Sequence, residues 1–584
     1  MKYKILFFLF FLFSKSYSQQ YLTGFISYLD EENKSINLEG VSVYWLDSSV
    51  GVISDQNGFY SIPLEKSYNK LIFKMLGFKE DLMVIDIQEK YNHIMTEDSN
   101  VLDEVIISKR KNTIQKSYFK TQNIVNVSSD ELLKAACCNI SESFETNPSI
   151  DVSFSNAITG VKQVRMLGLE SPYLLITEEN IPMVRGASQV FGLSFIPGTW
   201  VESMQITKGT GSVVNGFESI SGQINVELKK PLNDSLFFLN LFRSNMGRNE
   251  LNLHLNKKIN ERLSTGGYIH VNENNSINDN NLDGFLDHPK SKAFNLFNRW
   301  QYINTDKGLV SFLGLRIMKD EKESGENTKE MAFIRKPWVS EINTKRFDSN
   351  FKFGYVNPNI PYQSAGFQMA YSRHVQKSFF GLRNYNIKQN SFYSSLLYNS
   401  ILGNTMNKFK TGFNYSYDDF KEIVDIEKKI YNRIDKSIGA FFEYSYDNLD
   451  KLSLVAGLRY DVHNNLGSFF TPRFHLRFQP LERSVFRFSI GSGRKSSNIF
   501  SENQRVFSSG RKIYIDNQKG NFYGLQSEKA LNYGVSFRQG FNLNNQQGDI
   551  TIDYYITDFQ NQIVVDWEKQ GELHFYNHDH LDCS

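Results

Sequence analysis

The sequence is poor in the residues on which disulfide-stapled and metal-binding proteins depend. Only three of its 584 residues are cysteine, which is too few for a disulfide framework. The formal net charge is +2, so no excess of positive charge indicates a nucleic-acid partner. After Phe13 no apolar run is long enough for a transmembrane helix. No Ser/His/Asp arrangement, zinc-ligand spacing or phosphate-binding loop stands out, and the sequence predicts no enzyme.

Aromatic residues, in contrast, make up 14% of the chain. Together with a negative mean hydropathy, that content suits a protein with many polar loops and with rings at interfaces. The chain begins with two lysines in its first four residues, an apolar stretch from Ile5 to Phe13, and small residues at Ser16 and Ser18. This order predicts a secretory signal over residues 1–18. An exported chain without transmembrane helices is periplasmic, secreted, or a β-barrel in an outer membrane.

Residues 20–96 predict a small β-sandwich. About seven short β-rich runs are separated by turn signals, and the turn Asp55-Gln56-Asn57-Gly58 leaves Gly58 free to adopt a positive φ. The spacing L-x-G-V-x-V, followed by S-D-x-N-G-x-Y-x-I, resembles the carboxypeptidase-regulatory-like domain. The region contains no catalytic constellation, so the resemblance implies a module for stability or contact.

A second region, residues 128–231, begins with a Ser/Asp helix-capping signal and helical spacing in SSDELLKAACCNISESFETNPSI. The runs VKQVRMLGL, YLLITEENIPM and VESMQITKGTGSVVNGFESISGQINVELKKP follow. The last run contains four glycines, at positions 209, 211, 216 and 222. In order and spacing these runs resemble the plug domain of TonB-dependent outer-membrane receptors. Pro231 marks the transition to the third region.

Residues 232–584 alternate between apolar and polar side chains. In TPRFHLRFQP, Phe474 and Phe478 alternate with Arg473 and Arg477, and NKFKTGFNYSYDD, KLSLVAGLRYD, FRFSIGSGRK and DITIDYYITD repeat the pattern. Aromatic-rich, period-two segments with a polar second face are typical of a membrane β-barrel. The expected fold class is mostly β: a small N-terminal β-sandwich, an α/β plug and an antiparallel transmembrane β-barrel.

The number of barrel strands is lower than this architecture requires. About fifteen strand candidates follow Pro231, whereas a plugged transporter barrel needs about 22 strands. The chain ends with ELHFYNHDHLDCS, which is polar and departs from the alternation. An open sheet edge in lipid is costly because its backbone groups lack partners. We therefore expect a partial barrel and a C-terminal truncation, through a shortened gene, a frameshift or an incomplete sequence.

Residues 97–127 are polar and rich in turn signals, and they predict an extended linker. Embedded in this linker is VLDEVIIS, in which an acidic pair precedes three β-branched residues. Such a run can add a strand to the exposed sheet edge of a partner. It resembles the TonB box, and the resemblance implies that TonB binds Leu102, Asp103, Glu104, Val105, Ile106 and Ile107. The alternative is that the run forms the last strand of the first domain.

A weaker candidate site lies in NDNNLDGFLDHPK, which contains D-x-N-x-D-G-x-x-D. Oxygen ligands at this spacing, with a glycine for the sharp turn, are typical of a calcium loop. The predicted ligands are Asp279, Asn281, Asp283, Phe285 (through its carbonyl) and Asp287. Lys290 stands where a bidentate Glu is expected, so the motif is incomplete. The alternative is an extracellular loop rich in Asn and Asp, and no cofactor other than structural calcium is predicted.

The resemblances together imply a TonB-dependent receptor of the outer membrane with its N-terminal domain in the periplasm. The expected function is TonB-driven import of a scarce solute, an iron–siderophore or other metal complex. The expected partners are TonB, the lipid bilayer and that solute, with substrate contacts in plug loops near VRGASQVFG (184–192) and in barrel loops. The adjacent Cys137 and Cys138 hint at a soft metal such as copper, or are two small residues near a helix end. A non-transporting binding or scaffold protein, and a truncated remnant without function, are the alternatives.

Overall fold

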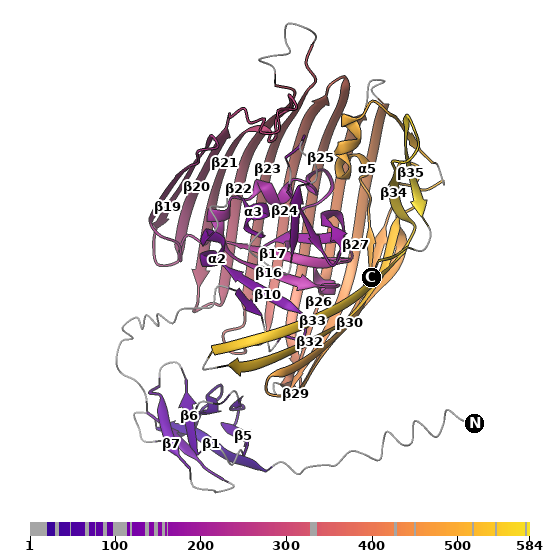
Figure 1. The fold of residues 1–584 in the computed structure, drawn as a ribbon. Coiled ribbons are helices and arrows are strands. Elements are labelled where there is room, and N and C mark those ends of the chain that lie inside the picture. Colours follow the sequence, from indigo (N-terminus) through magenta and orange to yellow (C-terminus); the bar gives the residue numbers. More distant parts are fainter. Residues whose placement is uncertain are drawn as a thin grey trace, which may run out of the picture. The chain divides into compact units, whose positions relative to one another are not determined.

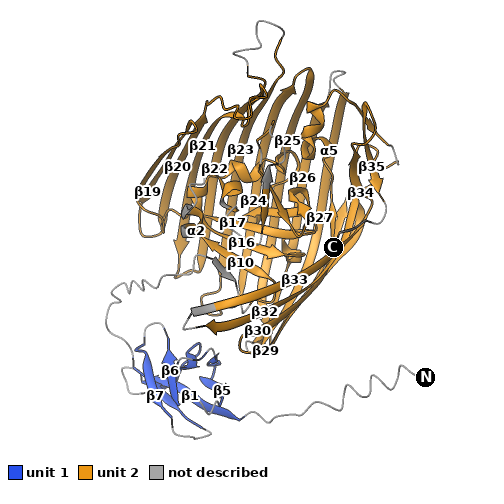
Figure 2. Cartoon of the chain, viewed as in Figure 1, with its two compact units in different colours: residues 1–111 blue, residues 112–584 orange. Residues whose placement is uncertain are grey.

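The computed structural model divides the chain into two compact units, residues 1–111 and residues 112–584 (Figure 2). Within the described residues, no helix is both long and apolar enough to cross a membrane. The structure describes residues 20–29, 34–46, 48, 50–64, 69–75, 78–85, 90–96, 114–116, 120–134, 139–144, 150–154, 158–160, 162–327, 336–424, 429–448, 451–516, 519–543, 546–578 and 581–583.

The first unit contains eight short strands in two sheets. In one sheet β2 and β5 flank β1, and β8 pairs with β1 in parallel; the other has the order β4-β3-β6-β7. Buried side chains from both sheets, among them Trp45 and Tyr60, form the core. Gly58 has a φ of +73°, which confirms the turn prediction. The strands are β1 (Tyr21–Leu29), β2 (Ser35–Asn37), β3 (Ser42–Trp45), β4 (Gly51–Ile53), β5 (Phe59–Pro63), β6 (Lys70–Lys74), β7 (Asp81–Val84) and β8 (His93–Met95).

The second unit begins with the plug, which is built on a six-stranded sheet of order β15-β14-β17-β16-β10-β9. The pair β14 and β17 is parallel, and its neighbours are antiparallel. Trp200, Ile206 and Ile224 are buried in the core of this domain. The strands are β9 (Ile114–Lys116), β10 (Ile124–Ser128), β14 (Leu174–Glu178), β15 (Ile181–Val184), β16 (Val201–Lys208) and β17 (Gly222–Leu228).

Short elements surround the plug sheet. A three-stranded sheet of order β11-β12-β13 stands beside it, and the helices predicted after residue 128 are only four to six residues long. The elements are α2 (Ser129–Lys134), α3 (Ile140–Ser143), β11 (Asp151–Phe154), β12 (Lys162–Met166), β13 (Leu169–Glu170), η2 (Ser171–Tyr173), η3 (Gly186–Ser188), η4 (Gly192–Phe195), η5 (Gly198–Trp200) and η6 (Val213–Asn215).

The plug sheet begins earlier in the chain than the sequence suggested. Strand β9 and all but the last residue of β10 lie within residues 97–127, which the sequence assigned to an extended linker. Val125 and Val127 of β10 are buried in the plug core and lie opposite Ile206 and Met204 of β16. Residues 114–128 therefore contribute two strands to the plug, because burial of these valines favours the sheet over an extended connection.

A sixteen-stranded antiparallel sheet wraps around the plug (Figure 1). Each strand from β18 to β30 pairs with the next, followed by β32, β33 and the three-residue β36, and β18 and β36 are its edges. The alternation in the sequence predicted about fifteen strands. The strands are β18 (Phe237–Arg243), β19 (Arg248–Lys258), β20 (Leu263–Asn274), β21 (Lys290–Asn304), β22 (Leu309–Gly325), β23 (Val339–Val356), β24 (Ser364–Phe380), β25 (Arg383–Leu402), β26 (Asn404–Val424), β27 (Lys429–Asn448), β28 (Leu452–His463), β29 (Gly467–Leu481), β30 (Ser484–Lys495), β32 (Glu528–Leu543), β33 (Gln546–Gln560) and β36 (Leu581–Cys583).

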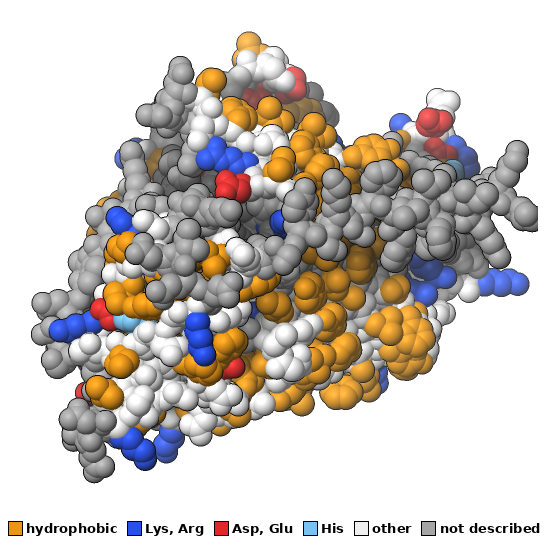
Figure 3. All heavy atoms as spheres, turned by 90° about the horizontal axis from the view of Figure 1, so that it is seen from below, with side chains coloured by type: hydrophobic (Ala, Val, Ile, Leu, Met, Phe, Trp, Pro, Cys, Tyr) orange, Lys and Arg blue, Asp and Glu red, His pale blue; other side chains and the backbone are white. Residues whose placement is uncertain are grey.

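The predicted alternation separates the two faces of this sheet. On β29, Phe474 and Phe478 are 38% and 42% exposed, whereas Arg473 and Arg477, each directly before one of them, are buried. The buried Arg473 reaches the plug, where its Nη1 donates to the carbonyl oxygen of Ser212 at 2.8 Å. Apolar side chains thus face outward and polar ones face the plug, and Figure 3 shows hydrophobic side chains gathered on the surface seen from below.

The connections between strands differ at the two ends of the sheet. At one end they are short, as at 305–308 and 482–483, and at the other they include 275–289 and 496–527. Membrane barrels have short periplasmic turns and longer outer loops, so the end with the long connections is the outer end. Short elements at this end pack on an aromatic cluster that includes Phe500, Phe507 and Phe575. They are α5 (Ile499–Glu502), η7 (Gln504–Ser508), β31 (Lys512–Ile515), β34 (Gln562–Asp566) and β35 (Glu572–His578).

Candidate functional site

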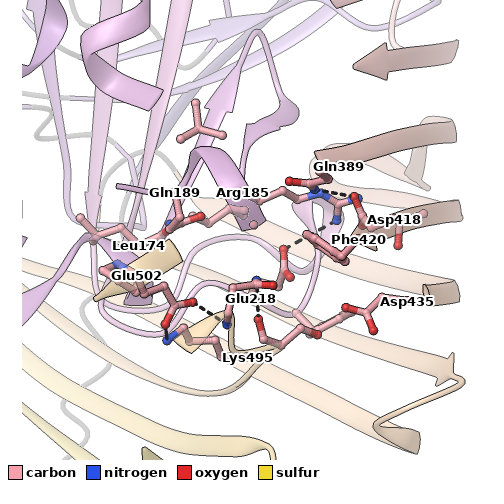
Figure 4. Close-up of a pocket in the computed structure, with 18 of the residues that line it drawn as sticks. Leu174, Arg185, Gln189, Glu218, Gln389, Asp418, Phe420, Asp435, Lys495 and Glu502 are labelled. Carbon is pink, nitrogen blue, oxygen red and sulfur yellow. Dashed lines mark hydrogen bonds and ion pairs between the residues drawn. The ribbon is translucent and has the colours of Figure 1, made fainter. Parts of the chain in front are cut away.

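A polar cavity lies between the plug and the barrel wall, toward the outer end (Figure 4). Three plug segments contribute to it, at 172–175, 184–189 and 217–218. The wall is formed by β25 to β28, the end of β30 and the start of the 496–527 connection. The side chains that line it include Leu174, Arg185, Gln189, Glu218, Gln389, Asp418, Phe420, Asp435, Lys495 and Glu502.

Arg185 projects from the plug toward the barrel wall and joins the two domains. Its Nη2 lies 2.6 Å from Oδ2 of Asp418, and its Nη1 lies 3.9 Å from Oε2 of Glu218 on a second plug loop. Asp418 Oδ1 accepts hydrogen bonds from Gln389 Nε2 at 3.0 Å and from Ser391 Oγ at 2.5 Å. The barrel wall therefore fixes the orientation of the carboxylate that holds Arg185.

The two plug groups of this cluster have shifted pKa values. Burial raises the pKa of the Glu218 carboxyl, Arg185 only partly offsets that effect, and Asp418 and Asp435 raise the pKa further. Burial acts to lower the pKa of Arg185, but the attraction of Asp418 and Glu218 outweighs it and holds this pKa above its usual value. Arg185 therefore stays charged, whereas Glu218 binds a proton more readily than an exposed Glu does.

A second charged group lies on the other side of the cavity. Lys495 Nζ lies 2.7 Å from Oε2 of Glu502 and 3.2 Å from Oε2 of Glu528. The hydroxyl of Tyr173, from the plug, donates to Oε1 of Glu528 at 2.8 Å, and its ring centre lies 4.6 Å from Lys495 Nζ. The cavity is thus bounded on two sides by charged contacts that run from plug to barrel.

Two further plug carboxylates, Glu178 and Glu179, contact basic side chains of the wall. Glu178 Oε2 lies 2.9 Å from Arg316 Nη1. Glu179 Oε1 lies 2.6 Å from Arg299 Nη2, and its Oε2 lies 2.9 Å from Lys352 Nζ. Burial alone would raise the pKa of Glu179, but Lys352 and Arg299 outweigh it and lower the pKa to about 2. The plug is therefore held in part by buried ion pairs whose members belong to different domains.

The residues singled out from the sequence fall in three different places. The TonB-box residues 102–107 and the pair Cys137 and Cys138 lie outside the described residues. Of the segment 184–192, Val184, Arg185, Gly186 and Gln189 line the cavity. The candidate calcium residues lie in the outer connection 275–289, away from it.

In the candidate calcium loop the carboxylates accept hydrogen bonds from the backbone. Asp279 accepts from the amides of Asp283 at 3.1 Å and Gly284 at 3.0 Å, and Asp287 Oδ2 accepts from the amide of Asn280 at 2.9 Å. These bonds shape a turn in which Gly284 has a φ of +82°. Across the part of the chain that the structure describes, no three His, Cys, Asp or Glu side chains are grouped so as to hold a metal ion.

The loop also includes the other two predicted ligands. Asn281 Nδ2 donates to Asp283 Oδ2 at 2.9 Å, and the amide of Phe285 donates to Asp283 Oδ1 at 2.8 Å. Calcium at this loop stays a prediction.

The fold and the cavity define a class: an outer-membrane β-barrel protein with an internal plug. Comparison with protein families matches residues 262–573 to the TonB dependent receptor-like β-barrel, 118–223 to the TonB-dependent receptor plug domain and 27–107 to the CarboxypepD_reg-like domain. The chain belongs to the TonB-dependent receptor family. Its members are transporters of the outer membrane, which confirms the predicted fold class and location and the expectation that the chain is not an enzyme.

Solved structures with the same fold include siderophore receptors. The siderophore receptor PirA from Pseudomonas aeruginosa has a TM-score of 0.57 at 15% identity, with 79% of this chain and 80% of that chain covered. The alcaligin outer-membrane receptor FauA from Bordetella pertussis has a TM-score of 0.58 at 10% identity, with 80% and 78% covered. A variant of the ferric enterobactin receptor PfeA from Pseudomonas aeruginosa, in complex with enterobactin, has a TM-score of 0.60 at 13% identity, with 79% and 77% covered. A search of curated proteins gave no match.

Several cavity residues were not singled out from the sequence. Glu218 lies in the glycine-rich end of the plug, and Lys495 and Glu502 flank the start of an outer connection. Asp418 had a usable signal, because it falls on the polar face of the alternation in NKFKTGFNYSYDD. That signal places Asp418 inside the barrel without naming its partner on the plug.

Proposed function

We propose that this receptor imports an iron–siderophore complex, or another scarce metal complex, with energy delivered through TonB. The observation that carries the proposal is the polar cavity formed jointly by the outer side of the plug and the barrel wall. Its lining combines the guanidinium of Arg185 and the ammonium of Lys495 with carboxylates and amides. These groups suit a polar metal complex, which offers acceptors and donors for charge-assisted hydrogen bonds. The fold shared with PirA, FauA and PfeA supports the siderophore class.

A site shared by two domains couples cargo binding to the position of the plug. Arg185 belongs to the plug and Asp418 to the wall, so a ligand that engages either group alters the contact between the domains. The contact between Arg185 and Asp418 can be exchanged for a contact with cargo, because a hydrogen bond between charged groups contributes only about 1.5 to 3 kcal/mol and the cargo supplies a replacement partner. Cargo binding can therefore weaken the hold of the wall on the plug loop at 184–189.

The segment 102–107 is the proposed binding segment for TonB. Its β-branched residues suit strand addition to a partner sheet, in which backbone hydrogen bonds carry the load. The first plug strand after this segment is β9, an edge strand that pairs with β10 over three residue pairs. A pull on the segment therefore reaches a short edge strand first, and the plug sheet would open from that edge.

The proposal is tested by iron uptake in iron-limited cells that lack other siderophore receptors. The full chain and its Ile106→Pro variant are expressed, and uptake of radioactive iron is measured from ferric catecholate and ferric hydroxamate siderophores. Proline removes a backbone donor and blocks strand addition. We expect the wild type to import iron from one of these complexes, and Ile106→Pro to bind that complex equally well without importing it. Ser99→Pro, outside the segment, is the matched control and should import normally.

Each alternative gives a different result. Uptake that survives in Ile106→Pro would show that the segment is not the TonB box. A wild type that binds a ferric siderophore at its surface but never imports the iron would be a binding protein rather than a transporter. A wild type that neither binds nor imports any ferric siderophore, but takes up another metal complex, would show that this other complex is the substrate.

A further inference from the structure

A row of basic side chains crosses the outward face of the barrel. Lys319 of β22 lies opposite Lys345 of β23, and Lys345 lies opposite Val375 of β24. Val375 lies opposite Lys388 of β25, which in turn lies opposite Lys421 of β26. All four lysines are exposed. We call Lys319, Lys345, Lys388 and Lys421 the basic row.

The basic row is electrostatically unfavourable by itself. Lys319 and Lys345, and likewise Lys388 and Lys421, are like charges directly opposite each other on adjacent strands, an arrangement that destabilises a sheet. Among the described residues, Lys319 has a carboxylate partner, Glu321, at 2.6 Å, and the other three lysines have none. An anion from outside the protein would remove this repulsion.

The surroundings of the row place it at the border of the lipid-facing surface. Arg373 and Lys377 flank Val375 on β24, and both are exposed without an ion pair among the described residues. Toward the periplasmic end of β22 and β23 the outward residues next to the row are apolar, with Ile317 52% and Phe347 38% exposed. The row itself lies in the half of these strands that is nearer the outer end. Basic side chains at the edge of an apolar band lie at the level of lipid headgroups.

A groove on β25, β26 and β27 crosses one end of the row. It is lined by Lys388, Asn390, Asp419, Lys421, Asn432, Arg433 and Ile434. Asp419 Oδ2 accepts a hydrogen bond from Asn390 Nδ2 at 3.4 Å, and among the described residues neither lysine forms an ion pair with this carboxylate. The groove therefore offers two ammonium groups and amide donors to an anion, and a phosphate group has the oxygens to accept from several of them.

We propose that the basic row binds the phosphate groups of lipids in the outer leaflet of the membrane. A lipid fits better than free phosphate because the row borders the apolar band, so the bilayer itself holds headgroups against it. Repulsion between opposed lysines is relieved when one phosphate lies between them. Binding along the row also joins β22 to β26 from the outside, which favours a fixed arrangement of these strands around the plug.

The experiment compares two short-chain lipids with the same acyl chains, phosphatidic acid and phosphatidylcholine. Binding to the purified full chain in neutral detergent is measured by the anisotropy of a fluorescent phosphatidic acid, with the other molecules as competitors. The test variant carries Lys345→Gln, Lys388→Gln and Lys421→Gln. The matched control carries Lys257→Gln, Lys307→Gln and Lys451→Gln, three exposed lysines at the short-turn end. A third variant carries Lys345→Arg, Lys388→Arg and Lys421→Arg.

We expect phosphatidic acid to bind the wild type more tightly than phosphatidylcholine, and the test variant to bind it about 100-fold more weakly. The control and the arginine variant should bind as the wild type does, which also shows that the row tolerates substitution. Equal binding of the two lipids, or an equal loss in the control variant, would overturn the proposal. Competition by inorganic phosphate as effective as that by phosphatidic acid would also overturn it, because the site would then bind the free anion.

Discussion

Arg316 of the barrel connects Glu178 of the plug to a chain of buried charges in the wall. Its Nη1 lies 2.9 Å from Glu178 Oε2, and its Nη2 lies 2.9 Å from Asp348 Oδ2 on the neighbouring strand. Asp348 Oδ1 lies 2.8 Å from Arg346 Nε, and Arg346 Nη2 donates to the carbonyl oxygen of Met183 at 2.7 Å. The chain thus begins and ends on the plug, at Glu178 of β14 and at Met183 of β15, the two strands of one hairpin.

Removal of the plug carboxylate should destabilise the receptor strongly. Glu178→Ala leaves two buried guanidinium groups with one carboxylate between them, and loss of one member of a buried ion pair costs about 3 to 5 kcal/mol. The midpoint of thermal unfolding in detergent measures the effect. Asp306→Ala, which breaks the exposed pair with Arg262, is the control and should cost less than about 1 kcal/mol. Equal shifts in the two variants would show that the buried chain does not hold the plug.

The neighbouring Glu179 should make stability depend on pH. Its pKa is about 2 in the folded protein against 4.5 for an unperturbed Glu. A carboxyl whose pKa is lowered by folding contributes stability above the unfolded pKa and loses it as the pH falls through the folded pKa. The difference corresponds to roughly 3 kcal/mol, present at pH 7 and lost progressively between pH 4.5 and pH 2.

Urea unfolding of wild type and Glu179→Gln at pH 7 and at pH 3 tests this dependence. The wild type should be more stable than the variant at pH 7, and the gap between them should narrow at pH 3. Glu170→Gln, at a half-exposed pair with Arg165, should show no such narrowing. A gap between wild type and Glu179→Gln that stays constant with pH would mean that Arg299 and Lys352 do not act on the Glu179 carboxylate.

The sequence predicts those features of the structure that depend on residues close together in the chain. It does not predict those that depend on contacts between distant segments. The alternation of Phe474 with Arg473 is a property of adjacent residues, so it predicted which face of β29 meets lipid and which meets the plug. The apolar residues of β10 gave no such signal, because three of them in a polar stretch become a strand only through pairing with β16, far along the chain. A strand was therefore predictable where the alternating segment is long. Which strands pair with each other was not predictable.

The candidate site divides in the same way. One of its three plug segments lies in 184–192, which the sequence singled out, whereas Glu218 of the plug was not singled out. The barrel half comes from strands about 200 or more positions later than that segment. Arg185 and Asp418 are separated by 233 positions, and no local pattern joins them. The basic row is a further case, since Lys345 and Lys388 become part of one row only through the register of β23, β24 and β25.

Calcium binding at the loop 279–287 is a separate prediction from the sequence. Calcium sites of this kind in extracellular modules bind with a Kd of about 0.1 to 1 mM. Titration of calcium into the purified receptor, followed by calorimetry, should give binding in this range, and Asp283→Asn should remove it. Asp306→Asn, in a turn at the other end of the barrel, should bind as the wild type does. Absence of binding at 10 mM calcium would leave the turn as a hydrogen-bonded loop that needs no metal.

Two adjacent aspartates of β26 face opposite sides of the barrel wall. Asp418 is buried and holds Arg185, whereas Asp419 lies on the outward face. Asp418→Asn preserves the shape of the side chain but removes the charge, which leaves Arg185 with Glu218 at 3.9 Å as its remaining carboxylate. Loss of a hydrogen bond between charged groups costs about 1.5 to 3 kcal/mol, so the orientation of Arg185 toward cargo should weaken.

We expect Asp418→Asn to bind the ferric siderophore that the wild type imports about 10- to 100-fold more weakly. Quenching of intrinsic fluorescence on purified receptors measures this affinity. Asp419→Asn changes the same chemical group one position along β26 and should bind as the wild type does. If both variants bind normally while Ile106→Pro still abolishes uptake, the transport function stands and cargo recognition lies outside this cavity. Asp418 faces the inside of the barrel and Asp419 the outside. If only Asp418→Asn weakens binding, the ferric siderophore therefore binds on the inside of the wall.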